Sequence, residues 1–445
     1  MSRELKTTVR FERSLISEGG DSIRYMIVEL SAAARAKADA GSTPLNIALV
    51  IDSSRSMYGS RLQSALRAAE GIIHCLTEKD FISVISFSDD TQVHVDGLRC
   101  DERGKDSALQ ALNYIGIRAG TNISGGWFKG AECIGTVMLE NPNCKNHILI
   151  LSDGHANRGT LDTSALAHHA NELQMRGVTV SAVGIGDDYS SSQLYSIAQY
   201  GGGRIHHAAH PPEIVEVVMG ESDELRDRCI ENLKVEIQFP DVMYKSLNII
   251  PTEMDSTKTR AVCIFGGLSA GASRSAIFRV CAPEGKKNDE LKFVVRTQWR
   301  NSGQSKVVEG SVSTGVLKYA DPTKNQFQPV DDESALKIAK LWQSFCVFQA
   351  THLNRKKEYA KLEQFLTREI KYYRRFCKTA PHACILMSEL IQLSTIANED
   401  WGEASRKEMQ TSTYTNLYSL TDTRAGGSKR KWQDFTGQFT RPKLH

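Results

Sequence analysis

The fold is decided by the stretch LNIALVIDSS, residues 45–54, an almost unbroken apolar run of strand length that stops at polar residues. A strand that is apolar on both of its faces indicates a sheet covered on both sides, as parallel sheets are. The next stretch, RLQSALRAAEGIIHCL at residues 61–76, repeats apolar residues every three or four positions. That spacing indicates a helix lying on the sheet.

The same alternation of strand and helix continues along the chain. Strands are expected in FISVISFS (81–88), HILILSDG (147–154) and VTVSAVGIG (178–186), and helices in DSALQALNYI (106–115), GGWFKGAECIGTVMLE (125–140), TSALAHHANELQMRG (163–177) and SSQLYSIAQYGGG (191–203). This order predicts right-handed crossovers and a doubly wound, Rossmann-like α/β domain over residues 44–220. Binding sites of such sheets lie beyond the carboxyl ends of the strands, so polar residues directly after strands should carry the function.

The pattern differs on both sides of this domain. Short β-rich runs, such as LKVEIQFP (233–240) and LKFVVRTQWR (291–300), predict an all-β, sandwich-like domain over residues 221–320. The strand-like residues 1–43 are expected to belong to the same sandwich. Helical periodicity then predicts a C-terminal α-helical region over residues 331–420, and the polar, basic residues 421–445 predict a flexible tail.

Composition narrows the class of protein. The 445 residues are 40% hydrophobic and 24% charged, which is typical of a globular chain, and the net charge of +3 is too small to indicate a nucleic-acid binder. No apolar run approaches the ~18–20 residues of a membrane helix, and the first residues lack the apolar core of a secretory signal. A cytoplasmic protein is therefore expected, with a nuclear location as the alternative. The ten cysteines are scattered without a CxxC pair, which favours buried, reduced thiols over a disulfide framework.

Five oxygen-bearing residues follow the predicted strands. They are Asp52, Ser54 and Ser56 in DSSRS, Thr121 in GTN, and Asp153 in SDG. Hydroxyl and carboxylate oxygens are the ligands that Mg2+ prefers, and it usually keeps several waters. Because the set supplies only two negative charges, a bound ion would favour an additional carboxylate from a ligand.

This three-part motif, in this order, resembles the metal-ion-dependent adhesion site of von Willebrand factor type A (vWA) domains. The resemblance covers residues 44–220 and extends to FISVISFSDDTQV, GTNISGG and HILILSDGHANRG. It implies that Ser54 and Ser56 coordinate Mg2+ directly, with Mn2+ or Ca2+ as alternatives. It also implies that Thr121 and Asp153 coordinate directly or through water and that Asp52 works through water. The family generally uses the ion to bind protein partners, so a partner Asp or Glu is expected to complete the coordination.

One residue departs from the family pattern. Arg55 stands between the two serines, where the family often has glycine. A cation there could attract an acidic ligand or partly occlude the site, and the attractive role is slightly favoured.

Simpler interpretations accompany these residues. Serine and aspartate commonly cap free backbone groups at strand ends. The acidic pairs at 89–90 and 187–188 are better explained as solvated turn residues, and the histidines at 168–169, 206–207 and 210 lack the ligand spacing of a zinc site. A hydrolase would need a general base near the metal, for which His155 is the one candidate in the motif loops.

The sequence therefore predicts a non-enzymatic protein that binds an acidic group of a partner protein through Mg2+. A structural scaffold in a multiprotein complex, with a non-adhesive metal site, is the main alternative, and a metal-assisted hydrolase is the weaker one.

Overall fold

The computed structural model describes residues 5–34, 43–154, 156–186, 191–208, 224–302, 304, 306–402, 405, 406 and 409. The chain divides into two compact units. One unit is built mainly from Arg35–Asn232, and the other from Met1–Ala34, Leu233–Arg300 and Val307–Ala425. We call them the α/β unit and the β/helical unit.

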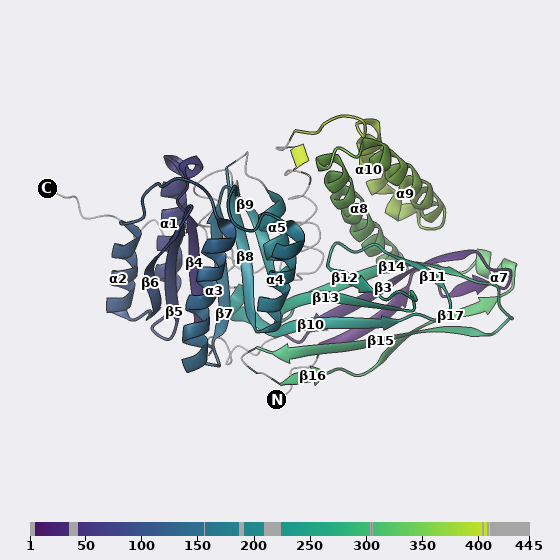
Figure 1. Ribbon diagram of the computed structural model, residues 1–445. Coiled ribbons are helices and arrows are strands. Elements are labelled where there is room, and N and C mark those ends of the chain that lie inside the picture. The colour runs from purple at the N-terminus through teal and green to yellow at the C-terminus, as the bar shows by residue number, and fades with distance from the viewer. Residues whose placement is uncertain are drawn as a thin grey trace. The chain divides into compact units, whose positions relative to one another are not determined.

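The α/β unit contains one six-stranded sheet with helices on both faces (Figure 1). Its strand order is β6-β5-β4-β7-β8-β9, and every neighbouring pair is parallel except β5 with β6. The strands are β4 (Leu45–Asp52), β5 (Phe81–Phe87), β6 (Thr91–Arg99), β7 (Lys145–Ser152), β8 (Val178–Ile185) and β9 (Gly202–Ala208). The helices are η2 (Arg55–Met57), α1 (Ser60–Cys75), α2 (Glu102–Leu112), α3 (Ile123–Glu140), α4 (Thr163–Met175) and α5 (Ser191–Tyr200). The Rossmann-like prediction is confirmed.

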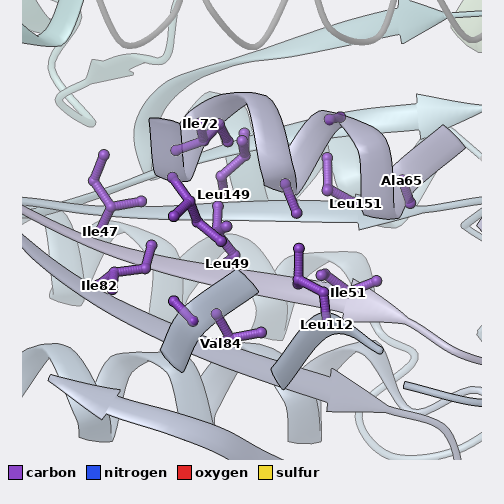
Figure 2. Close-up of a cluster of buried hydrophobic side chains, with 14 of the residues drawn as sticks. Ile47, Leu49, Ile51, Ala65, Ile72, Ile82, Val84, Leu112, Leu149 and Leu151 are labelled. Atoms are coloured by element: carbon purple, nitrogen blue, oxygen red, sulfur yellow. The ribbon is translucent and has the colours of Figure 1, made fainter. Parts of the chain in front are cut away.

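Strand β4 shows why the sheet is covered on both faces. All of its residues are buried, and successive side chains point to opposite sides. Ile47, Leu49 and Ile51 pack in the cluster that contains α1 and α2, whereas Ala48 and Val50 pack in the cluster that contains α3, α4 and α5. Figure 2 shows the first cluster, with the alternate β4 side chains facing α1.

Strand β6 was not expected from the sequence. This edge strand pairs antiparallel with β5, and Val95 is its one fully buried residue. A single buried position gives no period-two pattern, so the segment lacks the signal of a half-buried strand. An antiparallel edge strand on an otherwise parallel sheet is common in doubly wound folds.

The β/helical unit contains two sheets. Their strand orders are β1-β3-β14-β11 and β12-β13-β10-β15-β17-β2, with β16 paired to β15. The strands are β1 (Leu5–Phe11), β2 (Leu15–Ser17), β3 (Ser22–Ala32), β10 (Arg228–Gln238), β11 (Met243–Ser246), β12 (Thr252–Met254), β13 (Arg260–Ser269), β14 (Ser273–Ala282), β15 (Glu290–Asn301), β16 (Val307–Glu309) and β17 (Ser313–Ala320). The N-terminal strand β3 pairs with β14 from Ser22↔Ala282 to Ser31↔Ser273, so strands on either side of the α/β unit in sequence share one sheet.

Aromatic contacts join the two sheets. Phe11 of β1 lies edge-on to Phe293 of β15, with ring centroids 5.1 Å apart. Phe239, directly after β10, likewise contacts Phe278 of β14 at 5.3 Å. Edge-to-face pairs of this kind add to the apolar burial that holds two facing sheets together.

Helices follow the last strand of this unit. They are α7 (Pro322–Gln326), α8 (Asp332–Arg355), α9 (Tyr359–Thr379), η3 (Pro381–Leu386) and α10 (Met387–Thr395). Trp342 of α8 and Tyr373 of α9 are fully buried in a cluster that includes Tyr25 and Ile27 of β3. Phe376 of α9 is buried in the same cluster, and Tyr372 packs against it.

Two carboxylates are buried in this unit. Glu369 of α9 accepts from the Trp342 indole at 3.0 Å and pairs with Lys245 at 2.6 Å and Arg279 at 3.0 Å. Glu12 accepts from the backbone N–H of Tyr25 at 2.7 Å. Burial raises the pKa of Glu12 to about 7, although the nearby Arg24 acts in the opposite direction.

Three further observations bear on the sequence analysis. All ten cysteines are free, and seven of them are buried. Within the described ranges, no helix is long and apolar enough to cross a membrane. The domain boundaries drawn from the sequence stay predictions, and the tail at 421–445 lies outside the described residues.

Candidate metal centre

Four of the five predicted site residues lie where β4 and β7 end, and Thr121 lies just before α3. These neighbouring strands are parallel, and Ile51 pairs with Leu151. Asp52 and Ser152 are therefore side by side at the same level of the sheet. The Ser152 hydroxyl donates to Asp52 Oδ2 at 2.5 Å, and Asp153 follows directly. Register between two strands thus brings together residues that are a hundred positions apart.

The loop after β4 folds back onto Asp52. The backbone N–H of Ser54 donates to Asp52 Oδ1 at 2.8 Å. The Ser54 and Ser56 hydroxyls lie 3.0 Å apart. Ser54 is almost fully buried whereas Ser56 is exposed, so this pair of oxygens lies at the boundary between the sheet edge and solvent.

Asp153 is the most unusual member of the set. Its side chain is 0% exposed. In the described part of the chain no group donates a hydrogen bond to either of its carboxylate oxygens. Arg61 of α1 is 3.5 Å from Oδ2, close enough for Coulomb attraction but not hydrogen-bonded. A buried carboxylate without donors is costly, and a cation is what would satisfy it.

Burial also acts on Asp52. The pKa of this carboxyl is raised to about 6, mainly by burial; hydrogen bonds from Ser152 and Ser54 act against the rise, and the negative charge of Asp153 adds to it. A cation beside the buried Asp52 carboxylate would stabilise its charged form.

Thr121 lies in a third loop, which leads into α3. The backbone N–H of Thr121 donates to Asn157 Oδ1 at 3.1 Å, and its carbonyl accepts from the N–H groups of Asn157 and Arg158. Asn157 and Arg158 stand shortly after Asp153, so Thr121 is anchored to the loop that follows β7. No hydrogen bond among the described residues joins the Thr121 hydroxyl to the other four predicted ligands.

The residues that flank Thr121 explain its motif. Gly120 has φ +74°, and a Cβ there would lie 1.6 Å from Asp89 Oδ1. Asn122 caps α3 by accepting from the N–H of Gly125 at 2.9 Å. Glycine and asparagine are therefore required by a tight turn and a helix start, and Thr121 is held between them.

A family model decides what this α/β unit is. The model of the von Willebrand factor type A domain matches residues 46–217, the range that spans β4 to β9 and all the predicted ligands. Residues 46–217 form a vWA domain. The match does not cover the β/helical unit.

Curated relatives match less than half of the chain. An uncharacterized protein of Synechocystis sp. is 30% identical over 188 residues, which are 42% of this chain and 43% of that protein. The inter-alpha-trypsin inhibitor heavy chain H1 of Bos taurus is 20% identical over 199 residues, or 44% of this chain and 22% of the relative. The chain thus spans less than half the length of these relatives.

Solved structures share the fold over a longer range. A von Willebrand factor type A protein from Catenulispora acidiphila has a TM-score of 0.65 and 14% identity, covering 95% of this chain and 97% of that one. The ArnB paralog VWA2 from Sulfolobus acidocaldarius has a TM-score of 0.56 and 16% identity, covering 93% and 99%. At such identities the likeness concerns the fold, which both structures share beyond the vWA domain.

Several residues that support the site were missed in the sequence. Arg118 holds the loop after β4 next to the loop of Thr121, because its backbone N–H donates to the Ser53 carbonyl at 2.7 Å and its guanidinium to the Ser53 hydroxyl at 3.1 Å. The same guanidinium pairs with Asp90 at 2.6 Å. Arg61 lies 3.5 Å from Asp153 Oδ2, and the Asn157 side chain accepts a hydrogen bond from the Thr121 N–H. Polar loop residues carry no periodic signal, so only the fold reveals these partners.

The five predicted ligands of the vWA domain fit a hard cation. They offer three hydroxyls and two carboxylates, and the Asp153 carboxylate lacks donors. Nowhere in the described ranges do three or more His, Cys, Asp or Glu side chains cluster as a metal site. A cation at this edge would therefore depend on the serine and threonine hydroxyls, which suits Mg2+.

The structure describes some, but not all, of the other residues that the sequence suggested as site candidates. Arg55 is exposed on η2. Asp89 and Asp90 are exposed in a turn and pair with Arg158 and Arg118, as expected for turn residues. His155, the acidic pair at 187–188 and His210 lie outside the described residues.

Proposed function

We propose that the vWA domain binds a divalent cation, Mg2+ in the first place, and uses it to bind an acidic side chain of a protein partner. The buried Asp153 carboxylate, which has no hydrogen-bond donor in the described chain, is the observation that carries this proposal. Bound Mg2+ would supply a positive charge with open coordination positions that accept a carboxylate.

Each residue of the set has a role in this proposal. Ser54 and Ser56 offer the two hydroxyls that lie 3.0 Å apart. Asp52, fixed by the Ser152 hydroxyl and the Ser54 N–H, orients waters or holds the ion. Thr121 offers a third hydroxyl from a loop anchored beside Asp153.

The limited negative charge explains why a partner would be needed. Two carboxylates and three neutral hydroxyls leave a divalent ion with unused coordination positions, as Mg2+ sites commonly do. A partner aspartate or glutamate adds a strong oxygen ligand. The match to the vWA family supports this use, because the family generally binds protein partners through such an ion.

Calorimetric titration with Mg2+ tests the proposal. Wild type should bind the ion, and Asp153→Ala should not. Asp106→Asn is the matched control, because Asp106 is an exposed acid on α2 and its loss removes one negative charge without touching the site. Circular dichroism of each variant shows whether the fold is kept.

A second titration in sodium acetate supplies a model carboxylate. Tighter Mg2+ binding by wild type in acetate supports a role for a partner acid. If wild type and Asp153→Ala respond alike under both conditions, the proposal is wrong and the scaffold alternative gains. Metal-dependent turnover of an ester or phosphate substrate by wild type alone would instead favour the hydrolase.

A further inference from the structure

An exposed arginine and an exposed tyrosine lie next to the candidate metal ligands. Arg55 separates Ser54 from Ser56, and Tyr58 ends the one-turn helix η2 that begins at Arg55. The backbone N–H of Tyr58 donates to the Arg55 carbonyl at 3.1 Å, so one turn brings the two residues together.

The exposure of Tyr58 is unusual. Its side chain is 80% exposed, although a tyrosine ring gains from burial. Gly59 follows with φ +84°, and a Cβ added there would meet no atom within 4 Å, so the space beside Gly59 is open. Tyrosine and arginine are the residues most enriched at the energetic centres of protein interfaces.

Arg55 also differs from the other arginines at this edge of the sheet. Arg61 pairs with Asp153, Arg118 with Asp90 and Arg158 with Asp89. No ion pair within the described part of the chain involves Arg55. Its charge is therefore available to an acid from outside.

We propose that Arg55 and Tyr58 form a second contact site beside the metal ligands, which selects a partner segment carrying two acidic side chains. This inference rests on the proposed function: one acid binds at the metal, and the second pairs with Arg55. Tyr58 packs against the apolar part of the same segment. The guanidinium can bind a carboxylate through two parallel hydrogen bonds, which gives the contact its specificity.

A selection experiment tests this without a known partner. Short random peptides displayed on phage are selected on the full chain, in Mg2+ and separately in EDTA. Peptides that bind wild type only in Mg2+ should carry two acidic residues. Their affinity should fall about tenfold in Arg55→Ala, the loss expected for one charge-assisted hydrogen-bonded pair.

Matched controls lie at the opposite end of the sheet. Arg99 pairs with Phe81 at the start of β5, and α2 begins just beyond it, which places the exposed Arg103 there. Leu139, 87% exposed, lies at the end of α3, shortly before β7 begins. Arg103→Ala and Leu139→Ala should bind the selected peptides as wild type does, whereas Arg55→Ala and Tyr58→Ala should not.

Charge reversal gives the sharpest outcome. Arg55→Glu should select peptides with one acid and one lysine or arginine, while Arg103→Glu should select the same peptides as wild type. Mg2+ titration of Arg55→Ala should match wild type, which shows that the metal site is intact.

The results separate the two proposals. Metal-dependent peptides with a single acid, bound equally by wild type and Arg55→Ala, would overturn the second contact site and leave the proposed function standing. Peptides bound equally in Mg2+ and EDTA, or no selected peptides at all, would count against both.

Discussion

Replacing Asp153 by asparagine should make the metal-free protein more stable. The side chain is fully buried, and neither carboxylate oxygen has a donor in the described chain. Asparagine keeps the shape and removes the charge. It also removes the repulsion that raises the pKa of Asp52. A residue placed for binding is thus expected to destabilise the empty fold, as at many functional sites.

The size of the effect follows from the contacts. An unsatisfied buried polar group costs about 1–3 kcal/mol, and more when it is charged. Arg61, 3.5 Å from Oδ2, offsets part of this. We therefore expect Asp153→Asn to raise the free energy of unfolding by about 2 kcal/mol, which is about 4–8 °C in Tm for a domain of this size.

Thermal unfolding in EDTA measures the stability of the metal-free protein, and thermal unfolding in Mg2+ measures the stabilisation by the bound ion. A ligand at about 100 times its Kd stabilises the folded state by about 2.7 kcal/mol. Asp153→Asn should melt above wild type in EDTA and below it in saturating Mg2+, because only wild type gains from the ion. If the variant melts below wild type in EDTA, the Asp153 carboxylate is already satisfied and the reasoning fails.

Three further predictions concern the rest of the fold. The Glu12 pKa is about 7 in the folded state against 4.5 as the ordinary value, so between these pH values the folded chain binds more protons than the unfolded chain. The free energy of unfolding should therefore fall by about 3 kcal/mol as pH rises through this range. Glu12→Gln should remove this pH dependence in urea denaturation at pH 4.5–8, and an unchanged pH dependence would contradict the raised pKa of Glu12. Glu369→Gln should cost about 3–5 kcal/mol, because it leaves the buried Arg279 and the half-buried Lys245 without their common partner. A loss below 1 kcal/mol in the same assay, the upper end for a surface ion pair, would show that solvent screens the cluster. Gly126→Ala should cost about 1–3 kcal/mol, because its Cβ would lie 2.6 Å from the Phe87 ring. Gly135→Ala on the same helix meets no atom within 4 Å and should stabilise the fold by about 0.5–1 kcal/mol. Equal effects of the two variants in chemical denaturation would show that packing around Gly126 is not the cause.

The α/β fold could be predicted because its strands are apolar on both faces. The side chains of the run at 45–51 pack alternately into two helical layers, as expected for a strand of a covered parallel sheet. The edge strand β6 could not be predicted, since only Val95 is fully buried there. Its place depends on pairing with β5, which no local pattern records.

The candidate site likewise contains residues that could be predicted from the sequence and residues that could not. Asp52 and Asp153 directly follow apolar strands, so their common location followed from the rule that parallel strands end at one edge. Arg61 and Arg118 act through tertiary contacts with Asp153 and Ser53, and their spacing in the sequence gives no hint of this. The lack of donors around Asp153 is likewise a property of the folded environment.

A crystal of the full chain grown with Mn2+ tests the central claim most directly, because anomalous scattering locates that ion. The account predicts a peak bound by the Ser54 and Ser56 hydroxyls, near Asp153 and Thr121, and no such peak in Asp153→Asn. A wild-type crystal in saturating Mn2+ with no peak at this edge of the sheet, or with the ion held elsewhere, would contradict it.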